Sequence, residues 1–494
     1  MLEGLYYLAV VLLLFSKGIG LYDGTVAFKL FLLPALVLLC GKIFLTKYNK
    51  KEILVIGAFL GVGALSYLLT GEKGLLLYIL LLVGMKGVPV KRVFQTSLLV
   101  WSISFFGITL SSLLHLYDTP FKVHDKLGMG HIFRWGLGYV HPNILHVSFF
   151  VLIILLGYLI KERFDFKVCL FLFAANCYVF LYSVSYAGFG MVSIYLMMQL
   201  YFKYRGKVGI PEKIFAYAVF PMAAALSLIG PLVLEGKAYE IINKLLNNRL
   251  ILAENFLKPE NLTPFGFRVA DLVTANLTMD NAYVFAFITY GYVVFAGIFI
   301  GYELLMHQLL KRNMGAEAIL TIAILGYGLV EPFLFNTSLK NVSVFLLGAA
   351  LFGELELKAE ENWLLTKCLG PVADRIRQGI SGKKGRMLVC GILAGLIVAA
   401  AYGMASKVPQ AYMVQRADCE VEGKDFKTFT EEYVQNHPEI RVLDYVDEDT
   451  FMEVFSGNIV KLEQIRGMLS AFLLGAAGLT VLLCGYYSIR KNRG

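Results

Sequence analysis

The chain has 494 residues, of which 58% are hydrophobic and only 16% are charged. Because a soluble globular protein carries about 25% charged residues, this composition excludes an ordinary soluble domain. The apolar residues form runs of about 20, the length that crosses a bilayer core, so we expect an all-α, polytopic integral membrane protein. The net charge of +9 does not indicate a nucleic-acid partner, because the basic residues concentrate in short loops that orient membrane helices.

In chain order, the apolar runs predict about 14 transmembrane helices. The first run lacks the basic leader and the small-residue cleavage site of a secretory signal, so we expect it to be a span. The runs lie near residues 5–20, 25–46, 53–70, 74–90, 94–115, 142–160, 167–183, 187–203, 213–234, 283–306, 317–335, 340–356, 386–405 and 466–488.

Basic residues mark every second connection between these runs, and the positive-inside rule places such loops in the cytoplasm. The basic stretches are 46–52, 85–92, 161–167, 203–213, 307–312, 382–386 and the tail 490–494. Both termini are then cytoplasmic. Three longer segments, 116–141, 235–282 and 406–465, become extracytoplasmic, and long connections are often functional. We therefore expect a multi-pass protein of the cytoplasmic membrane whose active face is extracytoplasmic.

The first long segment contains His131 and Arg134 and leads into the sequence His141-Pro-Asn143. Charged and polar residues at a membrane surface are functional candidates in a chain this apolar. Two structural alternatives stand beside this hypothesis. The segment could be an interfacial loop with an aromatic belt, and proline in the first turn is an ordinary helix start.

The second long segment begins with an apolar stripe at helical spacing over residues 239–257, which predicts a helix lying on the membrane surface. Arg249 falls within the stripe, so its charge must either snorkel to water or meet a partner. An anionic ligand would satisfy it, and the guanidinium fork suits phosphate especially well.

Further polar residues follow before and after the next apolar run. Arg268 and Asp271 precede it, and Asp280-Asn281 stands where a helix cap is expected, which is the structural reading of that pair. Glu331 lies inside the run 317–335, near its outer end, and is a functional candidate because a buried acid is costly.

Several classes of site are absent from the sequence. It has no phosphate-binding Walker A motif, no G-x-S-x-G, no H-E-x-x-H and no C-x-x-C spacing, so we expect no cofactor and no metal site. The acidic run at 444–449 could hold a metal, but a solvated face is the favoured interpretation. Cys419 stands in a polar loop without an obvious partner.

The order of these features resembles the O-antigen ligase and polymerase superfamily, the Wzy-like proteins. The resemblance covers about residues 1–356 and is carried by short motifs in a characteristic order. These are an arginine-bearing outer loop that ends in H-P-N, a serine-rich turn, a large outer loop with an arginine, a glycine, D-N-x-Y before a helix, and a final E and N. Matched residue by residue, they are Arg134, His141, Asn143, Arg249, Gly266, Asp280, Asn281, Glu331 and Asn341.

The resemblance implies a membrane glycosyltransferase that uses polyprenyl-diphosphate-linked oligosaccharides as donors. Polymerases of the family join repeat units to each other, and ligases pass a finished glycan to another acceptor. We expect a repeat-unit polymerase that makes a capsule, exopolysaccharide or O-antigen-like polysaccharide, with a ligase as the alternative. A flippase or transporter of the same lipid-linked glycan, or a non-catalytic scaffold, are alternatives of another class.

The chain departs from the family pattern at two positions. Tyr186 occupies the place of an arginine in the serine-rich turn 183–190, which removes one possible phosphate contact. Asn248 stands before Arg249 where a glycine is common.

The expected mechanism assigns charges and a base. Arg134 and Arg249, with Arg268 in reserve, would neutralise the departing diphosphate. His141, His131, Asp280 or Glu331 could accept the proton of the attacking sugar hydroxyl, and the sequence leaves this choice open.

Residues 357–385 read as a cytoplasmic linker, and 386–494 as a transmembrane pair that flanks the outer segment 406–465. Two spans around an outer domain resemble chain-length regulators of polysaccharide assembly, although this outer segment is far shorter. A flippase and a chain-length regulator of the same pathway are therefore the expected protein partners, and the pair could also be a hairpin that docks one.

Overall fold

A computed structural model describes residues 2–116, 121–125, 131–269, 278–358, 374, 383–405, 411–415, 428–429, 440–442, 452–456 and 458–491. Asp271, Cys419, the acidic run 444–449 and most of the linker 357–385 lie outside the described residues. The chain is mainly helical. In the described part, eight helices are long and apolar enough to cross a membrane, which confirms a helical membrane protein.

The expected count of 14 spans is not confirmed by the described residues. Each apolar run contains a helix, but several of these helices are shorter than their runs. The run 74–90 gives a helix that ends at Gly84, the run 317–335 gives one that ends at Tyr327, and the run 340–356 gives only Val344–Leu351. A helix that crosses the hydrocarbon core needs about 17–25 residues, so these three helices are short for a full crossing.

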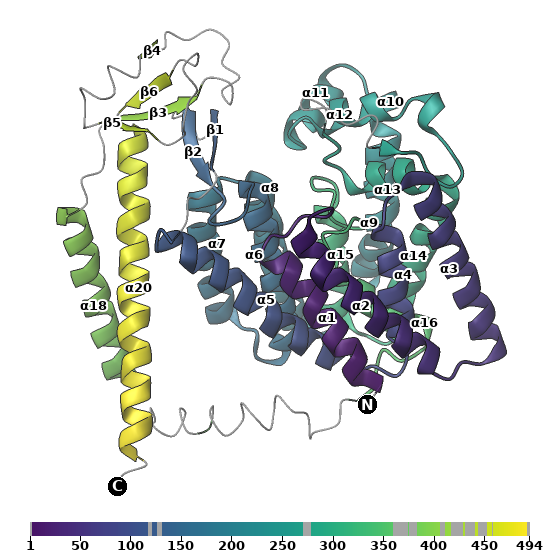
Figure 1. Ribbon diagram of the computed structural model, residues 1–494, viewed down its shortest axis with the longest axis horizontal. Coiled ribbons are helices and arrows are strands. Elements are labelled where there is room, and N and C mark those ends of the chain that lie inside the picture. The colour runs from purple at the N-terminus through teal and green to yellow at the C-terminus, as the bar shows by residue number, and fades with distance from the viewer. Residues whose placement is uncertain are drawn as a thin grey trace. The chain divides into compact units, whose positions relative to one another are not determined.

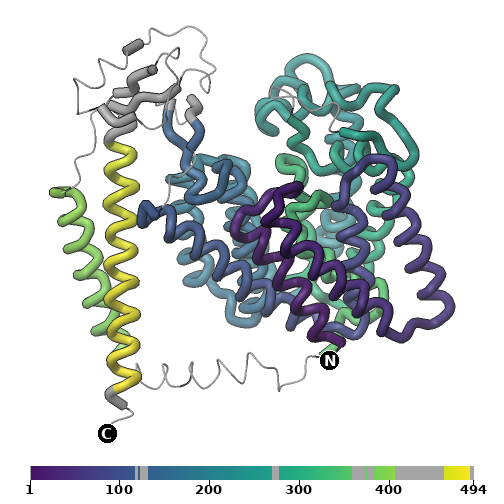
Figure 2. Tube along the Cα trace, viewed as in Figure 1, coloured from purple at the N-terminus to yellow at the C-terminus, as the bar shows by residue number. Residues whose placement is uncertain are grey.

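The chain forms two compact units (Figures 1 and 2). Unit 1 comprises Met1–Ser112 and Leu137–Ala359, and unit 2 comprises Leu113–Gly136 and Glu360–Gly494. The outer segment 116–141, which the sequence places in the first domain, is therefore divided between the two units.

Unit 1 is helical. Its longer helices are α1 (Leu2–Gly18), α2 (Val26–Leu45), α3 (Lys50–Thr70), α4 (Gly74–Gly84), α5 (Val90–Leu113), α6 (Pro142–Leu159), α7 (Phe166–Ser183), α8 (Tyr186–Arg205), α9 (Ile210–Leu228), α14 (Tyr292–Lys311) and α15 (Gly315–Tyr327). Its short helices are α10 (Gly230–Val233), α11 (Gly236–Leu245), α12 (Arg249–Phe256), α13 (Ala282–Tyr290) and α16 (Val344–Leu351). Helices α10, α11 and α12 gather at one end of this unit, at the top of Figure 1, which we call the α12 end.

Burial separates the inner helices of unit 1 from the outer ones. Nearly all residues of α6 and α15 are buried, whereas α2 and α3 expose large apolar side chains such as Val26, Val37 and Leu68. A helix that is apolar all round is either in a core or in contact with lipid. Helices α6 and α15 therefore form the core, and α2 and α3 are suited to face lipid.

A buried polar network joins the inner helices α6, α7 and α8. His146 lies between the Ser183 hydroxyl at 2.8 Å and the Asn176 amide oxygen at 2.9 Å, and Asn176 donates in turn to the Phe189 carbonyl at 3.0 Å. Gly188 of α8 faces the His146 ring, because a Cβ there would lie 2.5 Å from its Cγ. The serine-rich turn 183–190 thus serves helix packing.

The first test compares two glycines of the same helix. We expect Gly188→Ala to lower stability by about 1–3 kcal/mol, because the added methyl overpacks the His146 ring. Gly190 is the matched control, since nothing lies within 4 Å of a Cβ built there. Thermal unfolding in detergent measures both variants, and equal midpoints would contradict the packing described here.

Unit 2 combines two long helices with two small sheets. Helix α18 (Lys384–Ala405) packs along α20 (Asn458–Lys491), where Gly395 approaches the Phe472 backbone. Small residues allow such close helix packing in membranes. One sheet is the antiparallel pair β1 (Phe121–Asp125) and β2 (His131–Trp135). The other has the order β4-β6-β3-β5, from β3 (Ala411–Gln415), β4 (Thr428–Phe429), β5 (Ile440–Val442) and β6 (Met452–Ser456).

These strands were not expected from the sequence, which assigned only loops to 116–141 and 406–465. Period-two alternation, as in Phe121-Lys-Val123, is the signal of a strand, but five residues are too few to separate it from an interfacial loop.

Candidate functional site

Residues 328–343, which connect α15 to α16, form a segment without helix or strand at the α12 end. Buried carbonyl groups in such a segment need donors from elsewhere. Side chains supply several of them: Arg249 donates to Val330, Asn281 to Leu329, Tyr290 to Phe335 and Asn341 to Leu334. The 328–343 segment is thus held in one shape from several sides, and it carries Glu331 and Lys340.

Arg249 is the central donor. Its side chain is only 5% exposed, and Nε and Nη2 both donate to the Val330 carbonyl, at 3.2 and 3.0 Å. Nη1 donates to the Asn247 carbonyl at 3.0 Å, and Nη2 lies 3.7 Å from the Asp280 carboxylate. Arg249 therefore meets partners within the protein, and its charge remains shared with Asp280.

The helix that carries Arg249 differs from the single surface helix expected over 239–257. Asn247 and Asn248 adopt left-handed φ values of 52° and 67°, which ends α11 and starts α12. The Asn243 side chain accepts from the free amide groups of Leu250 and Ile251 at 3.1 and 3.3 Å. Asparagine and glycine are the residues that adopt this conformation most readily, so the departure at Asn248 keeps the backbone that a glycine would give.

Asn281 begins α13 as an N-cap, as its structural reading predicts. Its Oδ1 accepts from the Tyr283 and Val284 amides, and its Nδ2 donates to the Ser227 hydroxyl at 2.8 Å and to the Leu329 carbonyl at 3.1 Å. Its neighbour Asp280 is part-exposed beside Arg249. The pair therefore divides its roles: Asn281 ties together three elements, and Asp280 adds a negative charge to the site.

Glu331 lies in the 328–343 segment, one residue beyond the carbonyl that Arg249 holds. Burial raises the pKa of its carboxyl to about 7, and Asp280 raises it too, while Arg249, Lys340 and a hydrogen bond from Asn143 lower it. Glu331 is thus half ionised near neutral pH, which suits a group that takes up and releases protons.

His141 and Asn143 bring the start of α6 to this site. His141 is the N-cap, with Nδ1 accepting from the Asn143 amide at 3.1 Å, and Pro142 occupies the first helical turn. The ordinary helix start considered for this sequence is therefore present. Asn143 additionally places its side chain on Glu331.

The other matched residues of unit 1 lie farther from this chemistry. Asn341 is buried and binds Tyr302 at 2.8 Å as well as the Leu334 carbonyl. Gly266 has φ +110° and its α-carbon faces the Thr289 carbonyl so closely that a side chain would collide with it. Asn341 therefore satisfies a backbone carbonyl, and Gly266 allows a close approach of two backbone segments. Arg268 is exposed to solvent.

Arg134 and His131 belong to unit 2, on strand β2. This strand meets helix α20: the Trp135 indole donates to Glu463 at 3.1 Å, and Arg466 donates to the Phe133 carbonyl at 3.0 Å. Arg249 belongs to unit 1, whereas Arg134 and His131 belong to unit 2.

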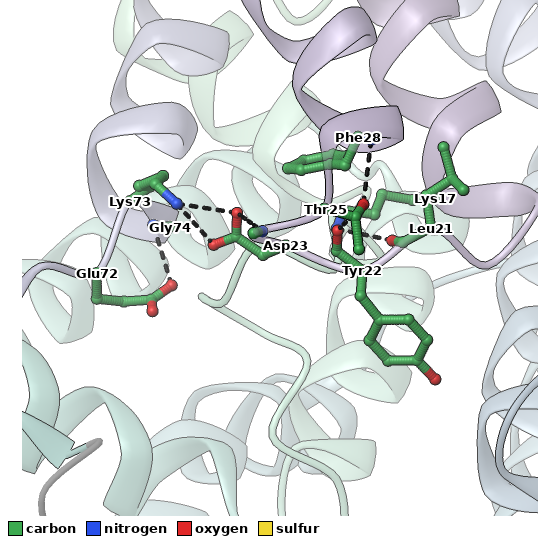
Figure 3. Close-up of polar contacts among 10 residues, drawn as sticks. Lys17, Leu21, Tyr22, Asp23, Thr25, Phe28, Glu72, Lys73 and Gly74 are labelled. Atoms are coloured by element: carbon green, nitrogen blue, oxygen red, sulfur yellow. Dashed lines mark hydrogen bonds and ion pairs between the residues drawn. The ribbon is translucent and has the colours of Figure 1, made fainter.

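The structure adds charged residues that the sequence did not single out. Figure 3 shows Lys73 paired with Asp23 at 3.0 Å, Glu72 accepting from the Gly74 amide, and Lys17 donating to the Leu21 carbonyl. Asp23, Glu72 and Lys73 come from the short connections that follow α1 and precede α4, and Lys17 lies in the last turn of α1. The only sequence signal was charge in loops of three or four residues, which also fits a solvated turn.

Lys340 was missed as well, although it is a lysine in a mostly apolar stretch. Its side chain is 6% exposed, and it lies close enough to Glu331 and Lys17 for both charges to act on its pKa. Within the described residues, no group of three or more His, Cys, Asp or Glu side chains could hold a metal ion. The candidate site therefore consists of basic side chains, Arg249 and Lys340, and acidic side chains, Asp280 and Glu331.

Comparison with known proteins adds no relative. No protein family model, no curated protein and no solved structure matched the chain.

The backbone at Asn248 can be tested by substitution. We expect Asn248→Val to lower stability by about 1–2 kcal/mol, because a β-branched residue is strained in the left-handed region, while Asn248→Gly stays close to the natural chain. Asn255→Val, in the right-handed part of α12, is the control. If both valine variants unfold at the same temperature in detergent, the result would contradict the left-handed backbone at Asn248.

The hydrogen bonds from Arg249 to the 328–343 segment give another test. Arg249→Lys keeps the charge but loses the fork that binds the Val330 and Asn247 carbonyls, at a cost of about 1–3 kcal/mol. We expect faster amide hydrogen exchange in 328–343, measured by mass spectrometry. Exposed Arg268→Lys is the control. Unchanged amide exchange in the Arg249 variant would show that the Arg249 hydrogen bonds do not hold the 328–343 segment.

Proposed function

We propose that this chain is a membrane glycosyltransferase that polymerises polyprenyl-diphosphate-linked oligosaccharide repeat units into a cell-surface polysaccharide. The order of motifs shared with the O-antigen ligase and polymerase superfamily supports the substrate class. The observation that carries the proposal is the placement of Glu331, an acid with a pKa near 7, beside Arg249 and Asp280 at one end of a membrane-embedded helical unit.

The proposal assigns the general base to Glu331. A base works best when its pKa lies near the working pH, and burial brings the Glu331 carboxyl there. Among the other candidates in unit 1, Asp280 lies beside Arg249, and the Nδ1 atom of His141 is occupied by the Asn143 amide. Asn143 holds the carboxylate by its hydrogen bond, and Arg249 fixes the adjoining backbone.

The reaction follows from these positions. The hydroxyl oxygen of an acceptor sugar attacks the anomeric carbon of the donor, its proton passes to Glu331, and the bond from that carbon to the diphosphate breaks. The polyprenyl diphosphate leaves with the electron pair of that bond. Positive charge at the site lowers the energy of the transition state as charge grows on the leaving group.

We place the α12 end on the extracytoplasmic side of the cytoplasmic membrane. The connections at the opposite end contain the basic stretches 46–52, 85–92, 161–167, 203–213 and 307–312, and such loops stay in the cytoplasm. The donor glycan would therefore meet the site after it has crossed the membrane.

The proposed base predicts a pH profile. With Glu331 as the base, the polymerisation rate should rise as pH increases through about 7, because only the deprotonated carboxylate accepts a proton. We expect Glu331→Gln to lower kcat by about 100-fold or more and to remove this rise. The assay uses purified protein in lipid with a lipid-linked repeat unit, and products are separated on a gel.

Exposed Glu240→Gln, on α11, is the matched control for a lost carboxylate at the same end. A ladder with an unaltered pH profile in the Glu331 variant would reject Glu331 as the base. Absence of a ladder with several repeat units in the natural chain would reject the polymerase, and transfer to an added acceptor would then identify a ligase.

A further inference from the structure

Lys340 carries a buried charge that no side chain among the described residues pairs with. It lies in the 328–343 segment, its side chain is 6% exposed, and its ammonium group forms no hydrogen bond or ion pair with those residues. Burial lowers the pKa of its ammonium group to about 8, so the group is still mostly protonated at neutral pH. An unpaired ammonium in a poorly solvated place is costly, and such groups commonly meet an anion.

A second cation lies nearby. Lys17, at the end of α1, is 7% exposed, and its ammonium lies 3.6 Å from the centre of the Phe28 ring. Its ammonium group donates to the Leu21 carbonyl, at 3.1 Å, which does not neutralise its charge. Lys17 lies close enough to Lys340 for its charge to lower the pKa of the Lys340 ammonium group, so the two cations repel each other.

The acids around the two lysines do not supply a compensating negative charge in full. Asp23 is paired with Lys73 at 3.0 Å (Figure 3), and Asp280 lies beside Arg249. Burial raises the pKa of Glu331 to about 7, so this acid is only partly ionised at neutral pH. Neither Lys340 nor Lys17 forms an ion pair with a described acid.

We propose that Lys340 and Lys17 form an anion site that takes a phosphate or diphosphate group. Two ammonium groups match the multiple negative charge of a diphosphate, and lysine binds phosphate as a point charge. Glu331 adjoins the site, which is where a departing diphosphate would have to lie. The inference rests on the proposed function only where it assigns a lipid tail to the ligand. Binding of the anion itself does not depend on glycosyl transfer.

The test measures binding without turnover. Purified protein in nanodiscs of neutral phosphatidylcholine is titrated with inorganic pyrophosphate and with farnesyl diphosphate, and calorimetry gives the affinities. We expect Lys340→Met and Lys17→Met each to weaken pyrophosphate binding by about tenfold or more, the loss typical of one charge-assisted hydrogen bond. Lys237→Met, which removes an exposed lysine of α11, should bind as the natural chain does.

Two further arms identify the source of the anion. If farnesyl diphosphate binds more tightly than pyrophosphate, the ligand is lipid-linked. Weaker pyrophosphate binding in phosphatidylglycerol nanodiscs would show that a phospholipid headgroup competes for the same lysines. Both results support the phosphate-class site.

Thermal unfolding distinguishes a loss of anion binding from a loss of folding. Without ligand, Lys340→Met should unfold at the same or a higher temperature than the natural chain, because it removes an unpaired buried charge. Pyrophosphate should raise the unfolding temperature of the natural chain and not of the variant. Equal pyrophosphate affinity in the natural chain and Lys340→Met, or no saturable binding in either, would overturn the site. Binding that depends on Lys340 in a protein that makes no polymer would keep the site and reject the polymerase.

Discussion

Two hydrogen bonds from the Arg249 guanidinium to the Val330 carbonyl hold the start of the 328–343 segment against α12. They fix the first turn of a sixteen-residue connection that has no helix or strand of its own. Glu331 follows directly, and Lys340 and Asn341 stand at the other end of the same connection. Irregular backbone is tolerated in a membrane protein only where side chains or water satisfy it. The cluster of chemistry-bearing groups therefore depends on donors from α12, α13 and the connection itself.

Two kinds of charged group occur in unit 1. Arg249 meets Asp280 and Lys73 meets Asp23 as ion pairs, while Glu331, Lys340 and Lys17 form no ion pair with a described residue. The second kind is the more responsive to a ligand. Proton release by Glu331 and anion binding by the lysines are coupled by the same electrostatics, because each changes the charge that the other feels.

The sequence predicted the helical membrane fold because composition and run length are strong signals. It also identified Glu331, an acid in an apolar run, and the cap at Asn281. It could not predict the break at Asn247 and Asn248, because the apolar stripe continues across it. The roles of Lys340 and Lys17 depend on neighbours 323 residues apart in sequence, which no local pattern reveals. Arg134 was grouped with Arg249 by motif order, yet its strand packs on the C-terminal helix.

That strand has a consequence for the biogenesis of the protein. Trp135 and Phe133 meet Glu463 and Arg466, partners that lie 328 and 333 residues later in the chain. At a synthesis rate of about 5–20 residues per second, the hairpin leaves the ribosome tens of seconds before its helix exists. Unit 2 therefore cannot assemble during translation of the first helices. The β1–β2 hairpin can pack on α20 only after this last helix has been made. Assembly of the hairpin, which carries Arg134, therefore depends on the C-terminal residues.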